Sequence, residues 1–400
     1  MRRLKFRLAF LREPQRWVMA GVAIVFGTVA LILADGFIER IFVDFREAIV
    51  RSSLGHFQVL PAEDASGDAL ERLAALRPEI ESALAAFPGT VVAAKRSFVG
   101  LASLGERTIS FVGEGVEPER EQALSSELVV DRGRPLESID ERSVLLGEGL
   151  AKNLGADVGD LVTLLVTTPA GGVNAIEAEV VGIFYTSTKA YDDRALRLPL
   201  QATQALLRDE AISKFVGVLP RTSDTDDAVA ALQVSLAESG VRVKAWREIA
   251  DFYNKTVRLF SSQLAVVRGV IVAIVLLSVS NTLARNVMER TSEIGTMMAL
   301  GRTRKAIARL FVGEGLILGF ACGILGVLLG WMLALLISGI GIPMPPPPGM
   351  ARGFIGGIAF TPRIAVVALL LAASTSVIAS LLPALRASRL NIVDALRVGR

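Results

Sequence analysis

Four long apolar runs constrain this chain more than any other feature. A hydrocarbon core about 30 Å thick needs about 20 apolar residues at the rise of an α-helix, so each run is long enough to cross a bilayer. The second run contains one charged residue, Arg268, and the third contains one, Glu314. The mean hydropathy of +0.51 agrees with several membrane spans. The runs are Trp17–Ala34, Leu264–Ala284, Leu310–Ile342 and Ile364–Leu385.

Basic residues flank these runs unequally. Residues 1–16 and residues 285–309 each hold six Lys or Arg, and residues 386–400 hold four, whereas the loop between the third and fourth runs holds only Arg352 and Arg363. Because Lys and Arg are retained on the cytoplasmic side, both termini and the 285–309 loop are predicted to be cytoplasmic. A multi-pass protein of the bacterial inner membrane follows, with residues 43–255 outside.

Charge is divided between the two parts of the chain. Residues 43–255 carry 22 basic and 33 acidic side chains, and the remainder carries 21 basic and 7 acidic. The basic excess therefore lies beside the membrane, as orientation requires, and not on a folded soluble face as in a nucleic-acid binder. The sequence predicts membrane partners and no nucleic acid.

The segment between the first and second runs is predicted to be a large α+β periplasmic domain. Residues 70–86 and 224–239 have helical patterns, and short β-rich runs cover 91–94, 109–112, 162–167 and 179–184. Apolar residues also recur at helical spacing on both sides of this domain. One long helix over 249–284, projecting beyond the bilayer as a stalk, is one interpretation, and two helices separated by a loop is the other.

These patterns give a predicted domain organisation. The first run is interpreted as an uncleaved anchor and not a signal peptide, because no A-x-A site follows Ala34. The predicted segments are a cytoplasmic interfacial helix (1–16), the first span and stalk (17–42), the periplasmic core domain (43–248), the second stalk and span (249–284), a cytoplasmic coupling loop (285–309), the third span (310–342), a Pro-rich outer loop (343–363), the fourth span (364–385) and a cytoplasmic tail (386–400).

Conventional enzyme chemistry has few candidate residues. The chain has one cysteine, Cys322, which excludes metal sites with several Cys ligands. It has one histidine, His56, which argues against the usual catalytic triads and His-rich metal centres. No G-x-x-x-x-G-K-[ST] motif is present, so no ATP-binding loop is predicted in the chain. His56 is expected to be a surface or capping residue. We predict no catalytic residue, no metal site and no cofactor.

Charged and small residues inside the spans admit two interpretations each. Arg268 lies about one turn inside the outer end of the second run, and Glu314 lies about one turn inside the inner end of the third. Both residues either anchor their helices at the interface, Glu314 by reaching Arg309 or water, or line a transport pathway. Glycines recur every three or four residues in the third run, which permits close helix packing within one chain or at a dimer seam. They are Gly315, Gly319, Gly323, Gly326 and Gly330.

The cytoplasmic loop contains a short predicted helix over residues 290–301. We expect a cap near Ser292 and an end at Gly301, with Ile294, Met297 and Met298 on one face. Flexible Met side chains on a short helix suit a knob that docks in another protein's groove, although the same face could lie on the bilayer.

These residues resemble the FtsX/MacB-like (type VII) ABC transporter permeases. The resemblance lies in the cytoplasmic helix, the glycine-rich span, the C-terminal tail and two periplasmic segments, and the layout is closest to the lipoprotein-releasing permeases. The segments that carry it are Asn286–Gly301, Phe311–Leu316, Pro383–Arg389, Asp394–Arg397, Ser143–Asp160 and Val180–Phe184.

The resemblance implies a permease subunit without its own ATPase domain, which dimerises with itself or a paralogue. A separate ABC ATPase subunit would bind ATP and Mg, and its hydrolysis would drive extraction of a lipoprotein or another amphipathic substrate, with a periplasmic lipoprotein carrier as a further partner. ATPase coupling is then assigned to Glu289, Arg290, Glu293, Ile294, Gly295, Met297, Met298, Leu300 and Gly301.

In such a dimer, the first and second spans would line a cavity that holds acyl chains, since these need apolar area more than directional bonds. Ordinary helix packing would select the same residue types. A scaffold that signals through its stalks to a periplasmic hydrolase is the alternative function, and a membrane enzyme is a third. The predicted cavity residues are Val22, Val25, Val267, Val270, Ile271 and Ile274.

Overall fold

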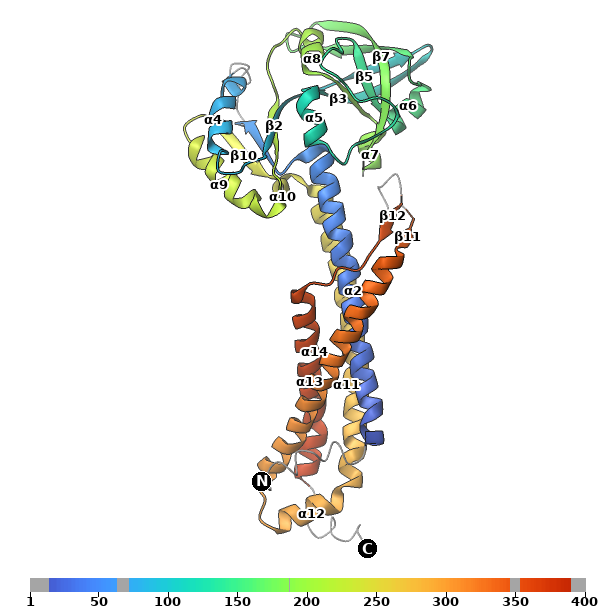
Figure 1. Ribbon diagram of the computed structural model, residues 1–400, viewed down its shortest axis with the longest axis vertical. Coiled ribbons are helices and arrows are strands. Elements are labelled where there is room, and N and C mark those ends of the chain that lie inside the picture. Colours follow the sequence, from blue (N-terminus) through green and yellow to red (C-terminus); the bar gives the residue numbers. More distant parts are fainter. Residues whose placement is uncertain (1–13, 63–71, 187, 346–352, 390–400) are drawn as a thin grey trace. The chain divides into compact units, whose positions relative to one another are not determined.

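The computed structural model describes residues 14–62, 72–186, 188–345 and 353–389. The chain divides into two compact units, shown in Figure 1. The helical unit comprises Met1–Phe42, Thr256–Pro343 and Ile355–Arg400, and the sheet domain comprises Val43–Lys255 and Met344–Phe354. The predictions for residues 1–13, for the Pro-rich segment 346–352 and for the tail beyond residue 389 lie outside the described residues.

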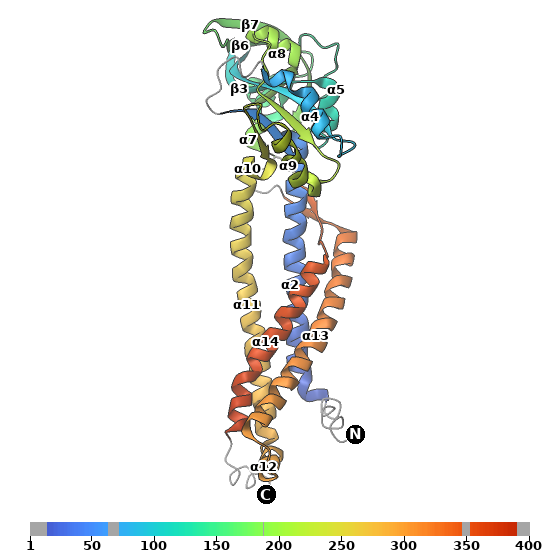
Figure 2. The ribbon, with the colours of Figure 1, turned by 90° about the vertical axis from the view of Figure 1, so that its left-hand side faces the viewer.

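Four helices of the described chain are long and apolar enough to cross a membrane, as the four runs predicted. Figure 2 shows them running side by side, with the short helix α12 between the ends of α11 and α13. The bounds are α2 (Pro14–Ile49), α11 (Asp251–Glu289), α12 (Thr291–Ala299), α13 (Arg304–Ile340) and α14 (Pro362–Ser388).

Two of these helices extend well beyond the apolar runs. Helix α11 is continuous over 39 residues, so the interpretation as two helices separated by a loop is wrong. Helix α2 covers 36 residues and passes directly into a π-helical turn, η2 (Val50–Leu54). Apolar residues that continue beyond these two runs pack against one another. Phe45 of α2 contacts Phe252 of α11 edge-on, with 5.9 Å between the ring centroids.

The sheet domain is built on one ten-stranded mixed sheet with the order β10-β1-β9-β2-β3-β8-β5-β7-β4, and β6 pairs with both β2 and β7. That double pairing closes β2, β3, β8, β5, β7 and β6 into a ring. The strands are β1 (Phe57–Pro61), β2 (Val91–Leu104), β3 (Arg107–Val116), β4 (Val129–Gly133), β5 (Ser143–Gly147), β6 (Leu161–Thr167), β7 (Val173–Tyr185), β8 (Ala195–Pro199), β9 (Lys214–Val218) and β10 (Val241–Ala245), with β11 (Ile342–Met344) and β12 (Phe354–Gly356) as a separate pair.

Two main cores fill this domain. One lies in the strand ring, where alternate residues such as Phe111, Val162 and Leu164 are buried together with Leu150 and Leu206 from helices. The second packs β1, β9 and β10 against α4 and α9. The helices are α4 (Arg77–Ala83), α5 (Pro118–Leu124), α6 (Glu148–Leu154), α7 (Lys189–Asp192), α8 (Leu200–Leu207), α9 (Thr225–Ser235) and α10 (Trp246–Ile249), with the 3₁₀ turn η3 (Thr222–Asp224).

The α+β prediction for this domain is confirmed, with differences in individual elements. The helix expected over 70–86 is interrupted by a turn at Leu76, because Pro78 lacks an N–H and begins a new helix, α4. The helix expected over 224–239 ends at Ser235. The four predicted strands are present, and β2 and β7 are much longer than the predicted runs because they pair with several neighbours.

Candidate functional site

The short helix α12 follows α11 after a single residue, Arg290, which is its N-cap. The cap expected near Ser292 is therefore wrong, because α11 continues to Glu289 and leaves no loop in which a serine could cap. At the other end, Gly301 has φ +85°, a left-handed conformation that favours glycine and ends the helix as predicted. The chain thus makes one tight turn on each side of this nine-residue helix.

The apolar face of α12 is turned toward its own chain. Ile294 is fully buried and Met298 is 8% exposed, while Met297 is partly buried. The prediction that this face is presented to another protein is wrong, because α11, α13 and α14 supply the apolar partners that cover it. The cluster comprises Val287, Ile294, Met298, Ile307, Phe311, Ala384 and Ala387.

The opposite face of α12 is the exposed one. Leu300 is 81% exposed and Met288, at the end of α11, is 70% exposed. Glu289, Glu293 and Gly301 are also exposed, whereas Gly295 is buried. Of the residues assigned to ATPase coupling, those available to a partner are therefore the acidic residues, Leu300 and Gly301.

Arg290 joins α12 to α13. Its Nη1 donates to Glu314 Oε1 at 3.1 Å and its Nε donates to Glu293 Oε2 at 3.0 Å. The guanidinium carbon also lies 5.8 Å from the centroid of the Phe311 ring. Glu314 was expected to reach Arg309 or water, and the structure instead pairs it with Arg290. Arg290 therefore connects the beginning of α12 with the third turn of α13.

The glycines of α13 face helices of the same chain. A Cβ on Gly315 or Gly319 would lie 2.8 or 2.6 Å from the Cβ of Ser380 or Ser376 in α14. On Gly326 it would lie 2.6 Å from the Cβ of Thr28, in α2. Gly323 and Gly330 meet Leu369 and Ile32 in the same way. Of the two interpretations, the structure supports packing within one chain.

The predicted cavity residues divide between exposed and packed positions. Val25 and Ile271 are partly buried against the cluster that contains Ile24 and Val275. The remaining four predicted residues face outward, with exposed fractions of 46–60%. They are Val22, Val267, Val270 and Ile274. The structure thus brings only Val25 and Ile271 together within one chain.

An ion pair links α2 and α11 in the helical unit. Arg268 Nε donates to Asp35 Oδ1 at 2.8 Å, and the Asp35 side chain is only 8% exposed. Arg268 was expected to extend to the interface alone. Its partner lies 233 positions away in the sequence, and only the folded chain reveals this pairing.

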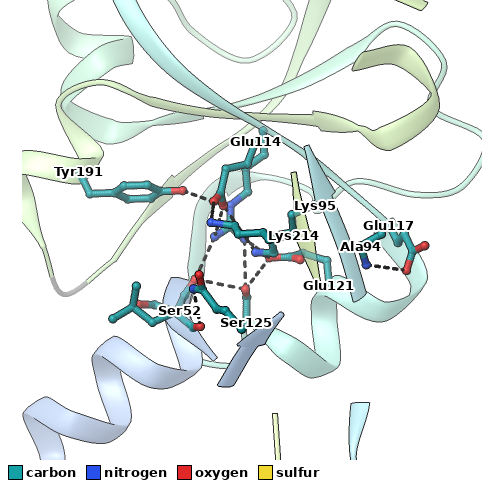
Figure 3. Close-up of polar contacts among 12 residues, drawn as sticks. Ser52, Ala94, Lys95, Glu114, Glu117, Glu121, Ser125, Tyr191 and Lys214 are labelled. Atoms are coloured by element: carbon teal, nitrogen blue, oxygen red, sulfur yellow. Dashed lines mark hydrogen bonds and ion pairs between the residues drawn. The ribbon is translucent and has the colours of Figure 1, made fainter. Parts of the chain in front are cut away.

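The sheet domain buries a cluster of charged side chains that sequence reasoning missed (Figure 3). Lys95 of β2 is fully buried, with its Nζ 3.1 Å from Glu121 Oε1 and 3.5 Å from Glu114 Oε2. Lys214 of β9 also contacts Glu114, at 3.2 Å. Arg197 of β8 is 1% exposed and forms an ion pair with Glu121. A signal was present for Arg197, since it is the one charged residue in the otherwise apolar strand β8.

The charges in this cluster stabilise one another. Burial alone would raise the pKa of Glu114, but the ammonium groups of Lys95 and Lys214 and the guanidinium of Arg197 outweigh it and hold that pKa well below its ordinary value. Burial and the Glu114 carboxylate raise the pKa of Tyr191, whose hydroxyl donates to Glu114 at 3.4 Å. The Glu114 carboxylate therefore stays ionised at neutral pH and the Tyr191 phenol stays neutral.

His56 is fully buried, so the expectation of a surface or capping histidine is wrong. The backbone N–H of Leu219 donates to Nδ1 at 3.0 Å, and Nε2 lies 2.9 Å from the hydroxyl of Thr222. The Thr222 hydroxyl in turn donates to Glu47 at 2.7 Å. Because an N–H can only donate, Nδ1 accepts and the ring is neutral, with its proton on Nε2. These contacts give His56 a structural role.

No group of three or more His, Cys, Asp or Glu side chains among the described residues is arranged to hold a metal ion.

Two family profiles match the chain. The MacB-like periplasmic core domain matches residues 18–234, and the FtsX-like permease C-terminal region matches residues 265–392. The chain is 26% identical over 273 residues to the lipoprotein-releasing system transmembrane protein LolC of Neisseria meningitidis serogroup B, covering 64% of this chain and 65% of that relative. It is 29% identical over 332 residues to the macrolide export ATP-binding/permease protein MacB of Hyphomonas neptunium, covering 80% of this chain and 47% of the relative.

Among solved structures, the periplasmic region of MacB from Actinobacillus actinomycetemcomitans aligns with 52% of this chain and 95% of its own, with 13% identity and a TM-score of 0.34. The chain spans slightly under two thirds of the length of the LolC relative that it matches. The FtsX-like match falls in the helical unit, whereas the MacB-like match includes the first span and most of the sheet domain and covers more than half of the chain. The chain belongs to the FtsX/MacB-like (type VII) family of ABC transporter permeases.

Proposed function

We propose that this chain is an inner-membrane permease subunit that couples ATP hydrolysis by a separate ABC ATPase subunit to extraction or export of a lipoprotein or another amphipathic substrate. The observation that carries this proposal is the joint match to a periplasmic core domain and a permease C-terminal region. The similarity to LolC, a lipoprotein-releasing system transmembrane protein, supports the choice of substrate class.

The exposed face of α12 is the proposed docking surface for the ATPase. It presents Glu293, with Glu289 at the end of α11 before it and the exposed Leu300 directly after it, and Arg290 ties this helix to α13. An exposed apolar side chain and exposed carboxylates on one short segment suit a small groove in a partner, because the apolar contact gives affinity and the charges give register. ATP and Mg would then be bound by the partner, and residues 285–309 would form the cytoplasmic coupling loop.

The remaining parts of the proposal concern orientation and assembly. With both termini cytoplasmic, residues 43–248 would be periplasmic and available to a lipoprotein carrier. A second permease chain, identical or paralogous, would face the exposed side of α11, on which Val267, Val270 and Ile274 lie. Acyl chains of the substrate would occupy the apolar space between the two chains.

Purification in mild detergent tests this proposal. The tagged chain should co-purify with a protein that carries a Walker A motif, and the complex in proteoliposomes should release a lipidated protein only with hydrolysable ATP. The matched control is the same lipoprotein without its acyl chains, which should not require the complex. ATPase association without lipoprotein release, combined with activation of a periplasmic hydrolase, would support the signalling scaffold instead.

A further inference from the structure

Helix α2 enters the sheet domain through an unusual turn. Its last α-helical residue is Ile49, and η2 follows as a π-helix that ends at Gly55, whose N–H donates to Val50 O at 2.8 Å. Gly55 has φ +67°, and a Cβ there would lie 2.8 Å from Gly217 O. The position thus requires glycine for its conformation and for its close approach to β9. A π-turn widens the helix and leaves some carbonyls free for other donors.

The carbonyl of Ser52, in the middle of η2, is held by two side chains of the sheet domain. Arg197 Nη2 donates to it at 2.9 Å and Ser125 Oγ donates to it at 3.1 Å. Arg197 is fixed in turn by its ion pair with Glu121 and by Ser125 Oγ at 3.2 Å from its Nη1. We name these four residues, Ser52, Glu121, Ser125 and Arg197, the stalk clamp. Figure 3 labels the first three of them.

A buried ion pair holds the end of a helix at a cost in desolvation free energy. Desolvation of the two charges offsets much of their attraction, so stability alone does not explain Arg197. A guanidinium differs from an apolar residue or a lysine because its rigid fork can donate to a carboxylate and to a separate carbonyl together. Arg197 uses this geometry to connect η2 with α5, while its own backbone lies in β8 of the closed strand ring.

We propose that Arg197 is a positioning residue of the transport cycle, which makes η2 and the strand ring move together so that displacement of α2 reaches the sheet domain. The inference rests on the proposed function for its transport arm and on the structure alone for its mechanical arm. Without Arg197, η2 would keep four hydrogen bonds to the sheet domain, none of which comes from a strand of the closed ring. They are the bond from the Ser125 hydroxyl, the bond from Glu127 N to Arg51 O at 3.1 Å, the bond from Gln58 Nε2 to Leu54 O at 2.8 Å and the bond from Arg51 Nη2 to Pro220 O at 3.4 Å.

The test variant removes both members of the buried pair, Arg197→Met with Glu121→Gln, so that neither of these two charges is left without the other. Lys95 loses its 3.1 Å contact with the Glu121 carboxylate. Lys95 keeps its contact with Glu114. The matched control is Arg96→Met with Asp209→Asn. It removes a second largely buried ion pair of this domain, which has no bond to η2. Arg197→Lys is a second test variant, because one ammonium group cannot replace both arms of the fork.

Hydrogen exchange of the full chain in detergent measures the mechanical arm. Amides of residues 50–55 should exchange about tenfold faster in both test variants, as expected for loss of one hydrogen bond from a charged donor. The same amides should be unchanged in the control pair. Equal exchange in the wild type and in Arg197→Lys, or equal acceleration in the control pair, would overturn the proposal.

Proteoliposomes containing the co-purified ATPase measure the transport arm. The test variants should hydrolyse ATP at the wild-type rate but release less substrate for each ATP, whereas the control pair should keep the wild-type ratio. An unchanged ratio in a test variant with accelerated exchange would overturn the coupling role of Arg197. A wild-type complex that never releases substrate would refute the proposed function and leave the exchange result standing.

Discussion

At the scale of single residues, burial and hydrogen bonding decide the properties of the one histidine. Burial, aided by the positive charge of Arg51, lowers the pKa of His56 to about 4. An unfolded chain would have the ordinary value near 6.5, so below that pH the unfolded state binds a proton that the folded state refuses. The neutral ring therefore contributes stability that is fully present above about pH 6.5 and is lost as the pH falls toward 4.

We predict that the His56→Gln variant lacks this pH-dependent contribution to stability. The variant loses the bond from Leu219 N and should unfold at a temperature several degrees lower at pH 7.5, but the gap should narrow between pH 6.5 and 4. The measurement is thermal unfolding of the full chain in detergent. Burial raises the pKa of Asp192 to about 6, so protonation of Asp192 stabilises the folded state as the pH falls, opposite to the effect of His56. This contribution is present in the wild type and in the variant, so the difference between their unfolding temperatures reports His56. A gap that stays constant with pH would contradict the prediction.

At the same scale, substitutions on the two faces of α12 should separate folding from docking. Ile294→Asp places a carboxylate in a closed apolar cluster, which costs several kcal/mol, so this variant should unfold at lower temperature or be degraded. Leu300→Asp should fold normally and lose ATPase association, because Leu300 is exposed. Thermal unfolding and co-purification measure the two effects. Normal stability of Ile294→Asp would show that the face is not packed.

At the scale of elements, close approach of α13 and α14 depends on glycine. Gly319→Ala should destabilise the chain by about 1–3 kcal/mol, because the new Cβ would lie 2.6 Å from Ser376 Cβ. Gly269→Ala, in α11, is the matched control, since nothing lies within 4 Å of its Cβ, and it should be neutral or slightly stabilising. Unfolding in detergent compares them. Equal effects of the two substitutions would contradict this packing.

The elements also show how far sequence reasoning reached. The spans and α11 were predictable because length and absence of charge act locally along the chain. Strands β1, β4, β5, β8, β9 and β10 were missed, since five-residue segments become strands only through distant partners. The same limit applies to the clamp, where 145 positions separate Arg197 from Ser52. For α12, periodicity identified an apolar face but not whether its partner was the same chain or another.

At the scale of the whole molecule, orientation in the membrane determines what each unit can meet. A cysteine replacing Ser223, which is exposed in the sheet domain, should react with an impermeant reagent added outside spheroplasts. A cysteine replacing Thr303, exposed between α12 and α13, should react only after permeabilisation. Cys322 is buried and should stay unlabelled as an internal control. Labelling of the Thr303 position in intact spheroplasts would reverse the topology.

The central claim, that an ABC ATPase docks on the exposed face of α12, is tested most directly by site-specific photocrosslinking in membranes. A photoreactive residue at Leu300 should capture a protein with a Walker A motif, identified by mass spectrometry. The control position is Val234 in the sheet domain, which is equally exposed at 81% and should capture none. Capture of the ATPase from Val234 and not from Leu300, or capture of lipid alone at Leu300, would contradict the account.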